Sequence, residues 1–119
     1  MVARRTAWAK SQKFCWLCGA TSDLQVHEIS RGFARSKAVK EPACWVRCCP
    51  ECHDLLADYS VWPIVRQCAL KLDRNPQCYD LAAINRLRGR SARAITQKEV
   101  DAALATIEPV PAYLVDAFC

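Results

Sequence analysis

The spacing of apolar residues differs between the two halves of the chain. In the first half they form short runs, LQVHEI at 24–29 and CWVRC at 44–48, which are brief and rich in strand-forming residues. Each of these runs predicts a β-strand. In the second half apolar residues recur at helical spacing, and one amphipathic stripe is formed by Val61, Ile64, Val65, Cys68 and Leu72.

Start and stop signals divide the second half into separate helices. Pro63 suits the first turn of the helix that carries the stripe, where its missing N–H is tolerated. Asp80 and Gly89 have the residue types that cap and end a short helix. Thr96 and Glu99 have the spacing of a capping box, which predicts a last helix that stops before Pro109. A further helix is expected to begin near His53, directly after the second strand.

Length and composition are those of one small soluble domain. The chain has 119 residues, of which 52% are hydrophobic and 24% charged. No window of membrane length lacks a charge, and the first residues contain no continuous apolar run, so we expect neither a signal peptide nor a membrane span. The expected location is therefore cytoplasmic. We divide the domain 1–119 into a basic arm (1–13), a cysteine-rich ββα unit (14–60) and a helical extension (61–119).

The net charge of +5 is unevenly distributed. Residues 1–40 contain eight Lys and Arg against two acids, whereas residues 41–85 contain four against six. A second basic run, RLRGRSAR, lies at 86–93. Basic ends around a neutral middle fit a partner that carries phosphates, although a solvated surface would give the same composition.

The nine cysteines include two pairs with metal-ligand spacing. Cys15 and Cys18 are separated by two residues, and so are Cys49 and Cys52, 30 residues further along the chain. Two such knuckles can supply four thiolates to one tetrahedral Zn²⁺. A redox dithiol would need only one pair, and no thioredoxin-like pattern follows either of them. Cys48 is an alternative to Cys49, but the two-residue spacing favours Cys49.

The only two histidines of the chain both lie beside this unit. His27 is in the first predicted strand and His53 follows Cys52 directly. Taken singly, each is best explained as an ordinary strand or helix residue. Taken together, a histidine on a strand and one on the first turn of the following helix can converge on a second metal ion. Rings on opposite sides of the unit would exclude such a site.

The stretch CWLC…LQVHEI…CWVRCCPECHDLL resembles HNH endonucleases of the zinc-containing ββα-metal (His-Me finger) type, which bacteriophages and prophages often carry. The resemblance covers about residues 14–60. It implies an α+β fold, with a zinc-stabilised, treble-clef-like ββα unit followed by the helical extension. It also implies that His27 is the first ligand of a catalytic divalent metal, that Glu28 occupies the general-base position, and that His53 is the second ligand.

Two residues differ from the family pattern. The base position holds glutamate instead of histidine, and an unperturbed glutamate is the weaker base by about 2 pKa units. The alternative assignment makes Glu28 a metal ligand and His27 the base. Either assignment needs a bend in the strand, because neighbouring side chains point to opposite faces. Cys44 stands where the family has an asparagine that orients the base through its loop.

The activity implied is metal-dependent hydrolysis of DNA phosphodiester bonds with little sequence specificity, in a bacterial host cell if the protein is phage encoded. The catalytic metal is left open among Mg²⁺, Mn²⁺, Zn²⁺ and Ni²⁺. The expected phosphate contacts, which give affinity without sequence readout, come from four residues of the loop after the first strand: Arg31, Arg35, Lys37 and Lys40. The alternatives are a DNA-binding module that has lost catalysis and a phage packaging accessory that binds a protein partner through the helical tail.

Overall fold

A computed structural model describes residue 8, residues 14–29, 35–89 and 93–110, and residue 115. Within these residues the chain forms a two-stranded sheet, five α-helices and one 3-10 helix. In chain order the elements are β1 (Gln25–Glu28), α2 (Arg35–Ala38), η2 (Pro42–Cys44), β2 (Trp45–Cys48), α3 (Pro50–Leu56), α4 (Ile64–Arg74), α5 (Leu81–Arg88) and α6 (Gln97–Leu104).

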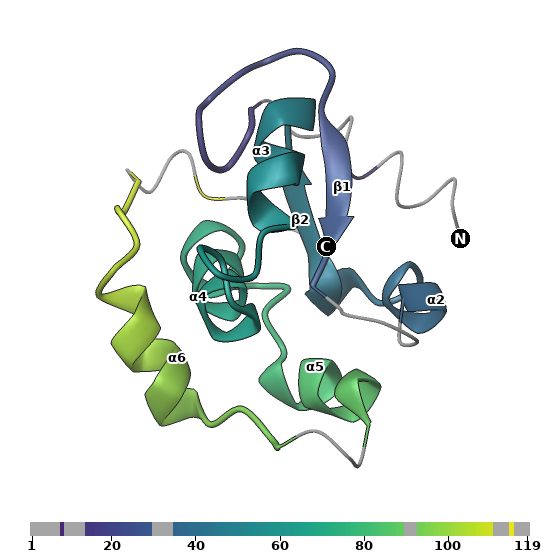
Figure 1. The fold of residues 1–119 in the computed structure, drawn as a ribbon, viewed down its shortest axis with the longest axis vertical. Helices are drawn as coiled ribbons and strands as arrows, with labels where there is room; N and C mark the ends of the chain where they lie inside the picture. Colours follow the sequence, from purple (N-terminus) through teal and green to yellow (C-terminus); the bar gives the residue numbers. More distant parts are fainter. Residues whose placement is uncertain (1–7, 9–13, 30–34, 90–92, 111–114, 116–119) are drawn as a thin grey trace.

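The first half forms a ββα unit. β1 and β2 pair antiparallel, with Gln25 opposite Cys48 and Glu28 opposite Trp45. α3 follows β2 directly and packs against the sheet (Figure 1). α3 begins at Pro50, three residues before the start expected from the sequence, because Pro50 occupies its first turn and Cys49 its N-cap. The segment between the strands, expected to be a basic loop, contains α2 and η2.

The second half is helical, as its capping signals predict. The Asp80 side chain accepts a hydrogen bond from the N–H of Ala83 at the start of α5, and Gly89 ends that helix with a φ of 85°. Thr96 and Glu99 form the predicted capping box at the start of α6. α4 lies at the centre of the molecule, with α6 packed along it (Figure 1).

The interior contains a cluster of tryptophans. The rings of Trp8 and Trp16 meet edge to face at 5.7 Å, and Trp8 lies 5.6 Å from Trp45. All three side chains are buried, so they pack in the core. Two cations lie among these rings, since the Arg47 guanidinium is 5.6 Å and the Lys71 ammonium 5.1 Å from the centre of the Trp8 ring.

The buried face of α4 differs from the apolar stripe that the sequence predicts. Cys68 is fully buried, but Val61 lies before the helix and is 50% exposed. Ile64, Val65 and Leu72 are only partly buried. The deeply buried face instead includes three long polar side chains, namely Gln67, Lys71 and Arg74.

These polar side chains have partners in the ββα unit. The Lys71 ammonium donates to the carbonyl of Trp45 at 2.8 Å, and Arg74 Nε donates to the carbonyl of Trp16 at 3.1 Å. Because buried carbonyls that lack a donor are costly, α4 stabilises the unit by supplying donors as well as apolar surface.

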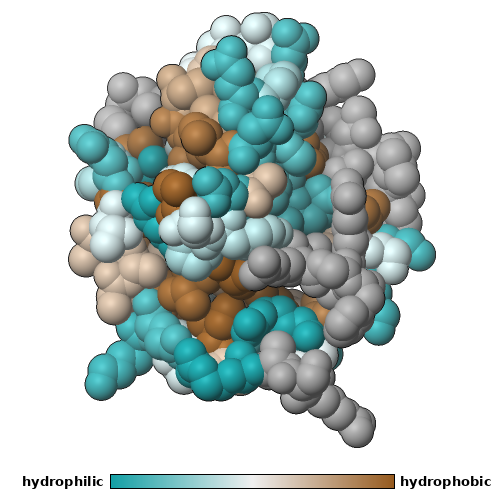
Figure 2. Space-filling view, viewed as in Figure 1, coloured by the Kyte–Doolittle hydropathy of each residue, from teal (hydrophilic) through white to brown (hydrophobic). Residues whose placement is uncertain are grey.

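The surface is mixed in polarity. Figure 2 shows hydrophobic residues reaching the surface between α4 and α5, and hydrophilic residues gathered at the α3 end of the same face. None of the helices in the described part of the chain has the length and apolar composition needed to cross a lipid bilayer.

Candidate metal centre and histidine pair

The four cysteines with paired spacing meet at one end of the ββα unit. Cys15 and Cys18 lie in the loop before β1, Cys49 caps α3, and Cys52 lies in the first turn of that helix. Their sulfur atoms are all within 4.8 Å of one another, and Cys18 Sγ is 3.6 Å from Cys49 Sγ. Sulfurs bound at about 2.3 Å to a tetrahedral zinc ion stand about 3.8 Å apart. The group therefore fits a structural metal ion such as zinc.

The local backbone explains how the first pair, Cys15 and Cys18, is held. The N–H of Cys15 donates to the carbonyl of Ala20 at 2.8 Å, and the N–H of Gly19 donates to the carbonyl of Cys15 at 3.0 Å. Gly19 has a φ of 79°, a left-handed conformation that favours glycine and turns the chain back after the second cysteine. The N–H of Leu17 points at Cys15 Sγ at 3.4 Å, so the knuckle directs backbone donors at the sulfur.

The thiols of this group differ in acidity. Burial raises the pKa of Cys15, but hydrogen bonds from backbone N–H groups, first that of Cys18 and then that of Leu17, lower it to about 7. Burial, followed by the neighbouring thiols, raises the pKa of Cys52. Since zinc binds thiolates, metal binding would release the remaining protons from the group.

The other buried cysteines are chemically separate from this group. Cys48 is fully buried and is not a member of the four-sulfur group, and burial raises its pKa to about 12. Burial also raises the pKa values of Cys44 and Cys68 to about 12, so these thiols stay protonated. Cys78 is disulfide-bonded.

The two histidines lie together on the same side of the unit. The ring of His27, from β1, is 5.3 Å from that of His53, from α3, and the planes meet at 78°. His27 is 5% exposed, whereas His53 is half-buried and can be reached from solvent. The arrangement that would have excluded a shared site, with rings on opposite sides, is not observed.

A third residue, missed by sequence reasoning, belongs to this pair. Gln67 of α4 is fully buried, and its Oε1 lies 2.7 Å from His27 Nε2. No local signal in the sequence identifies it. A periodicity based on apolar residues assigns such a glutamine to the solvent.

Glu28 lies on the other face of the strand. Glu28 is partly buried and lies opposite Trp45 in the strand pairing, and the Trp45 ring contacts Trp8. His27 lies opposite Val46, and its side chain contacts Gln67 on the other face of the strand. The pairing register runs without a bulge through both residues. Among the described side chains, no carboxylate joins the two imidazoles in a group of three metal-binding residues.

Cys44 does not replace the side-chain function of the family asparagine. Its side chain is fully buried, and its protonated thiol is a weak hydrogen-bonding group. Its backbone carbonyl instead accepts a hydrogen bond from the N–H of Ile29 at 2.7 Å. The backbone of Cys44 therefore ties down the chain directly after Glu28.

The basic residues expected at DNA are only partly described. Arg31 lies outside the described residues, and Arg35 is the first residue of α2. Lys37 and Lys40 are exposed, in and just after α2, and α2 lies beyond the arrowhead end of β1 (Figure 1).

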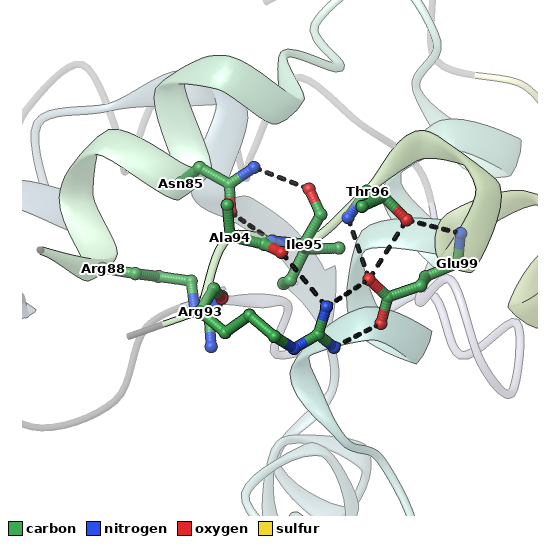
Figure 3. A network of polar contacts seen from close by, with 7 residues as sticks. All are labelled: Asn85, Arg88, Arg93, Ala94, Ile95, Thr96 and Glu99. Carbon is green, nitrogen blue, oxygen red and sulfur yellow. Dashed lines mark hydrogen bonds and ion pairs between the residues drawn. The ribbon is translucent and has the colours of Figure 1, made fainter. Parts of the chain in front are cut away.

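Two arginines of the second basic run, Arg88 and Arg93, make structural contacts. Figure 3 shows the Arg93 guanidinium against the Glu99 carboxylate, with N–O distances of 2.9 and 2.7 Å. Arg88 donates to the carbonyl of Arg93 at 2.7 Å, and the Asn85 amide bonds both the N–H and the carbonyl of Ile95. These side chains fix the connection between α5 and α6.

No family model, no curated protein and no solved structure matches the chain. The function must therefore be argued from the two groups of side chains. Four thiolates around one ion close its coordination sphere, which is typical of a structural site. The histidine pair, with one ring reachable from solvent, is the better candidate for chemistry.

Proposed function

We propose that the chain is a metal-dependent DNA endonuclease of HNH type that hydrolyses phosphodiester bonds with little sequence specificity. The observation that carries the proposal is the meeting of the two histidines, 5.3 Å apart, one from β1 and one from α3. They are the only histidines in the chain, and they lie on the same ββα unit as the four-cysteine group.

His27 and His53 would hold a divalent metal, Mg²⁺, Mn²⁺, Zn²⁺ or Ni²⁺, through one ring nitrogen each. When bound, such an ion supplies Lewis acidity at a phosphate oxygen and stabilises the leaving 3′ oxygen. His27 is held in place by burial and by its bond to Gln67, whereas His53 lies at the solvent side, where a phosphate can approach.

The alternation of side chains along β1 bears on the base role that the resemblance implies for Glu28. As the base that takes a proton from the attacking water, its side chain would have to leave the strand face opposite His27. We therefore expect Glu28→Gln to lower the cleavage rate less than His27→Ala does. An equal loss in both variants would favour Glu28 as the base.

Binding of the DNA backbone would use the exposed lysines near α2, Lys37 and Lys40, and the net charge of +5. Such contacts position a duplex without reading its sequence. They support the low specificity of the proposed activity.

Supercoiled plasmid with Mg²⁺ or Mn²⁺ tests the proposal. Wild-type protein should give relaxed or linear product, and His53→Ala should lower the rate by about 100-fold or more, since the metal contributes several kcal/mol. Asp54→Ala, at the neighbouring exposed position of α3, is the matched control and should keep the activity. Absence of product from wild-type protein at high concentration would refute catalysis.

A DNA-binding module without catalysis is the second candidate. The position of Glu28 across the strand and the burial of Cys44 favour it, since both depart from the catalytic pattern. In that case wild type and His53→Ala should shift DNA equally in a gel, with the same steep salt dependence, and neither should cut it.

A further inference from the structure

A buried chain of hydrogen bonds connects the two elements that carry the histidines. Gln67, on α4, meets His27 of β1 through its oxygen, with Oε1 and His27 Nε2 2.7 Å apart. Its amide nitrogen donates to the carbonyl of Leu56, the last residue of α3, and to that of Trp62, both at 2.8 Å. Gln67 therefore lies between the strand of His27 and the helix of His53.

The two carbonyl contacts determine which way the amide of Gln67 points. If the side-chain amide were turned over, so that its oxygen and nitrogen exchanged places, its oxygen would face the carbonyl oxygens of Leu56 and Trp62. All three oxygens are hydrogen-bond acceptors, so no hydrogen bond could form between them. Leu56 is fully buried, so water cannot relieve such a conflict at low cost. The oxygen of Gln67 must therefore face His27.

An amide oxygen only accepts hydrogen bonds, so His27 Nε2 must be the donor. In the neutral imidazole the proton is then on Nε2 and the lone pair is on Nδ1. Only a nitrogen with a lone pair can bind a metal ion or take up a proton. The chemistry of His27 is thereby assigned to Nδ1.

We infer that Gln67 is a positioning residue, which holds His27 in the tautomer that offers Nδ1, together with His53, to a divalent metal. This inference rests on the proposed function. Partners of this kind, bonded to the second nitrogen of a ligating histidine, fix the tautomer and the ring orientation, and their loss typically lowers metal affinity about 10- to 100-fold.

The tautomer can be measured without any catalytic metal. In zinc-loaded, ¹⁵N-labelled protein at pH 8, an ordinary imidazole with a pKa of about 6.5 is neutral, and long-range ¹H–¹⁵N correlation spectra identify the protonated nitrogen. The chain contributes only two imidazoles, and His53→Ala assigns them. We expect a slowly exchanging proton on His27 Nε2 and an unprotonated Nδ1. A proton on Nδ1 would overturn the inference.

The second measurement is Ni²⁺ affinity by calorimetry, with zinc content checked afterwards, for wild type, Gln67→Met and Lys71→Met. Lys71→Met removes a buried polar group one turn further along α4 and is the matched control. Gln67→Met should bind Ni²⁺ about 10- to 100-fold more weakly. Lys71→Met should bind within about twofold of wild type, although its melting temperature should fall as well, because it leaves the buried carbonyl of Trp45 without its donor. Equal weakening in both variants, or none in Gln67→Met, would reduce Gln67 to a packing role.

The two measurements separate this inference from the proposed function. Wild-type protein with the expected tautomer but no Ni²⁺ binding would refute the metal site and with it the nuclease, while the tautomer assignment would stand. Ni²⁺ binding by a protein that does not cut plasmid would instead support Gln67 as a positioning residue and refute only catalysis.

Discussion

Replacement of Cys49 by alanine removes one of the four sulfurs that lie within 4.8 Å of one another. Structural zinc contributes an apparent free energy of about 10–16 kcal/mol at neutral pH in small zinc domains. Shared equally, each thiolate accounts for about 3 kcal/mol, so Cys49→Ala should weaken zinc binding about 100- to 1,000-fold. A domain of this size has a total stability of only about 5–15 kcal/mol, so the ββα unit should also melt at a clearly lower temperature.

Cys48→Ala is the matched control, because it removes a sulfur at the preceding position, buried in the core and outside the group. It should cost about 1 kcal/mol for the small cavity that it leaves and should not change zinc affinity. The pair of variants also tests which of the two adjacent cysteines is the ligand.

The assay combines zinc content by elemental analysis, competition with a chromophoric zinc chelator, and thermal unfolding followed by circular dichroism. Wild type and Cys48→Ala should each purify with close to one zinc ion per chain. Equal zinc affinity in wild type and Cys49→Ala, or a larger loss in Cys48→Ala, would refute the assignment of the group. A wild-type chain that neither carries nor takes up zinc would refute the site itself.

Three further predictions follow from other contacts. The Arg93 guanidinium and then the Thr96 N–H lower the pKa of Glu99 from 4.5 to about 2. The stability that this carboxylate contributes is therefore complete above pH 4.5 and is lost as the pH falls towards 2. Over that interval the melting temperature of wild type should fall further than that of Glu99→Gln. Asp80→Ala removes the cap on the Ala83 N–H and should cost about 1 kcal/mol in urea unfolding, and no change would mean that the cap contributes nothing. The double change of Lys37 and Lys40 to alanine should lower the slope of log affinity against log salt for duplex DNA by about 0.9 per lost phosphate contact, and an unchanged slope would remove these lysines from the DNA surface.

Features set by local sequence could be predicted well. The first cysteine pair folds as a knuckle because two residues between the ligands, with Gly19 after the second, fix a tight turn. In the second pair Pro50 starts α3, with Cys49 as its N-cap. The capping box at Thr96 and the cap at Asp80 each depend on side chains within three residues of the backbone groups that they satisfy. The two strands were recognisable from their composition, and their pairing follows once the four cysteines must meet.

Features set by tertiary contacts could not be predicted. Periodicity assigns apolar residues to the core and polar residues to water, which placed Val61 on the buried side and left Gln67, Lys71 and Arg74 in solvent. The structure reverses this because backbone carbonyls at Leu56, Trp45 and Trp16 need donors, and α4 is the element that faces them. Nothing in a single sequence shows which carbonyls will lack a partner.

The helical extension is therefore part of the histidine site and not an appendage to it. One face of α4 carries three polar side chains spaced by four and three residues. Gln67 donates to α3, Lys71 donates to β2, and Arg74 donates to the first cysteine knuckle. The motifs that carry the resemblance to HNH endonucleases lie within about residues 14–60, but His27 depends on a side chain at 67 for its hydrogen bond. A ββα unit cut after residue 60 would keep all four sulfurs and both imidazoles and would lose the group that orients His27. In this chain the arrangement of the histidines requires both halves of the domain.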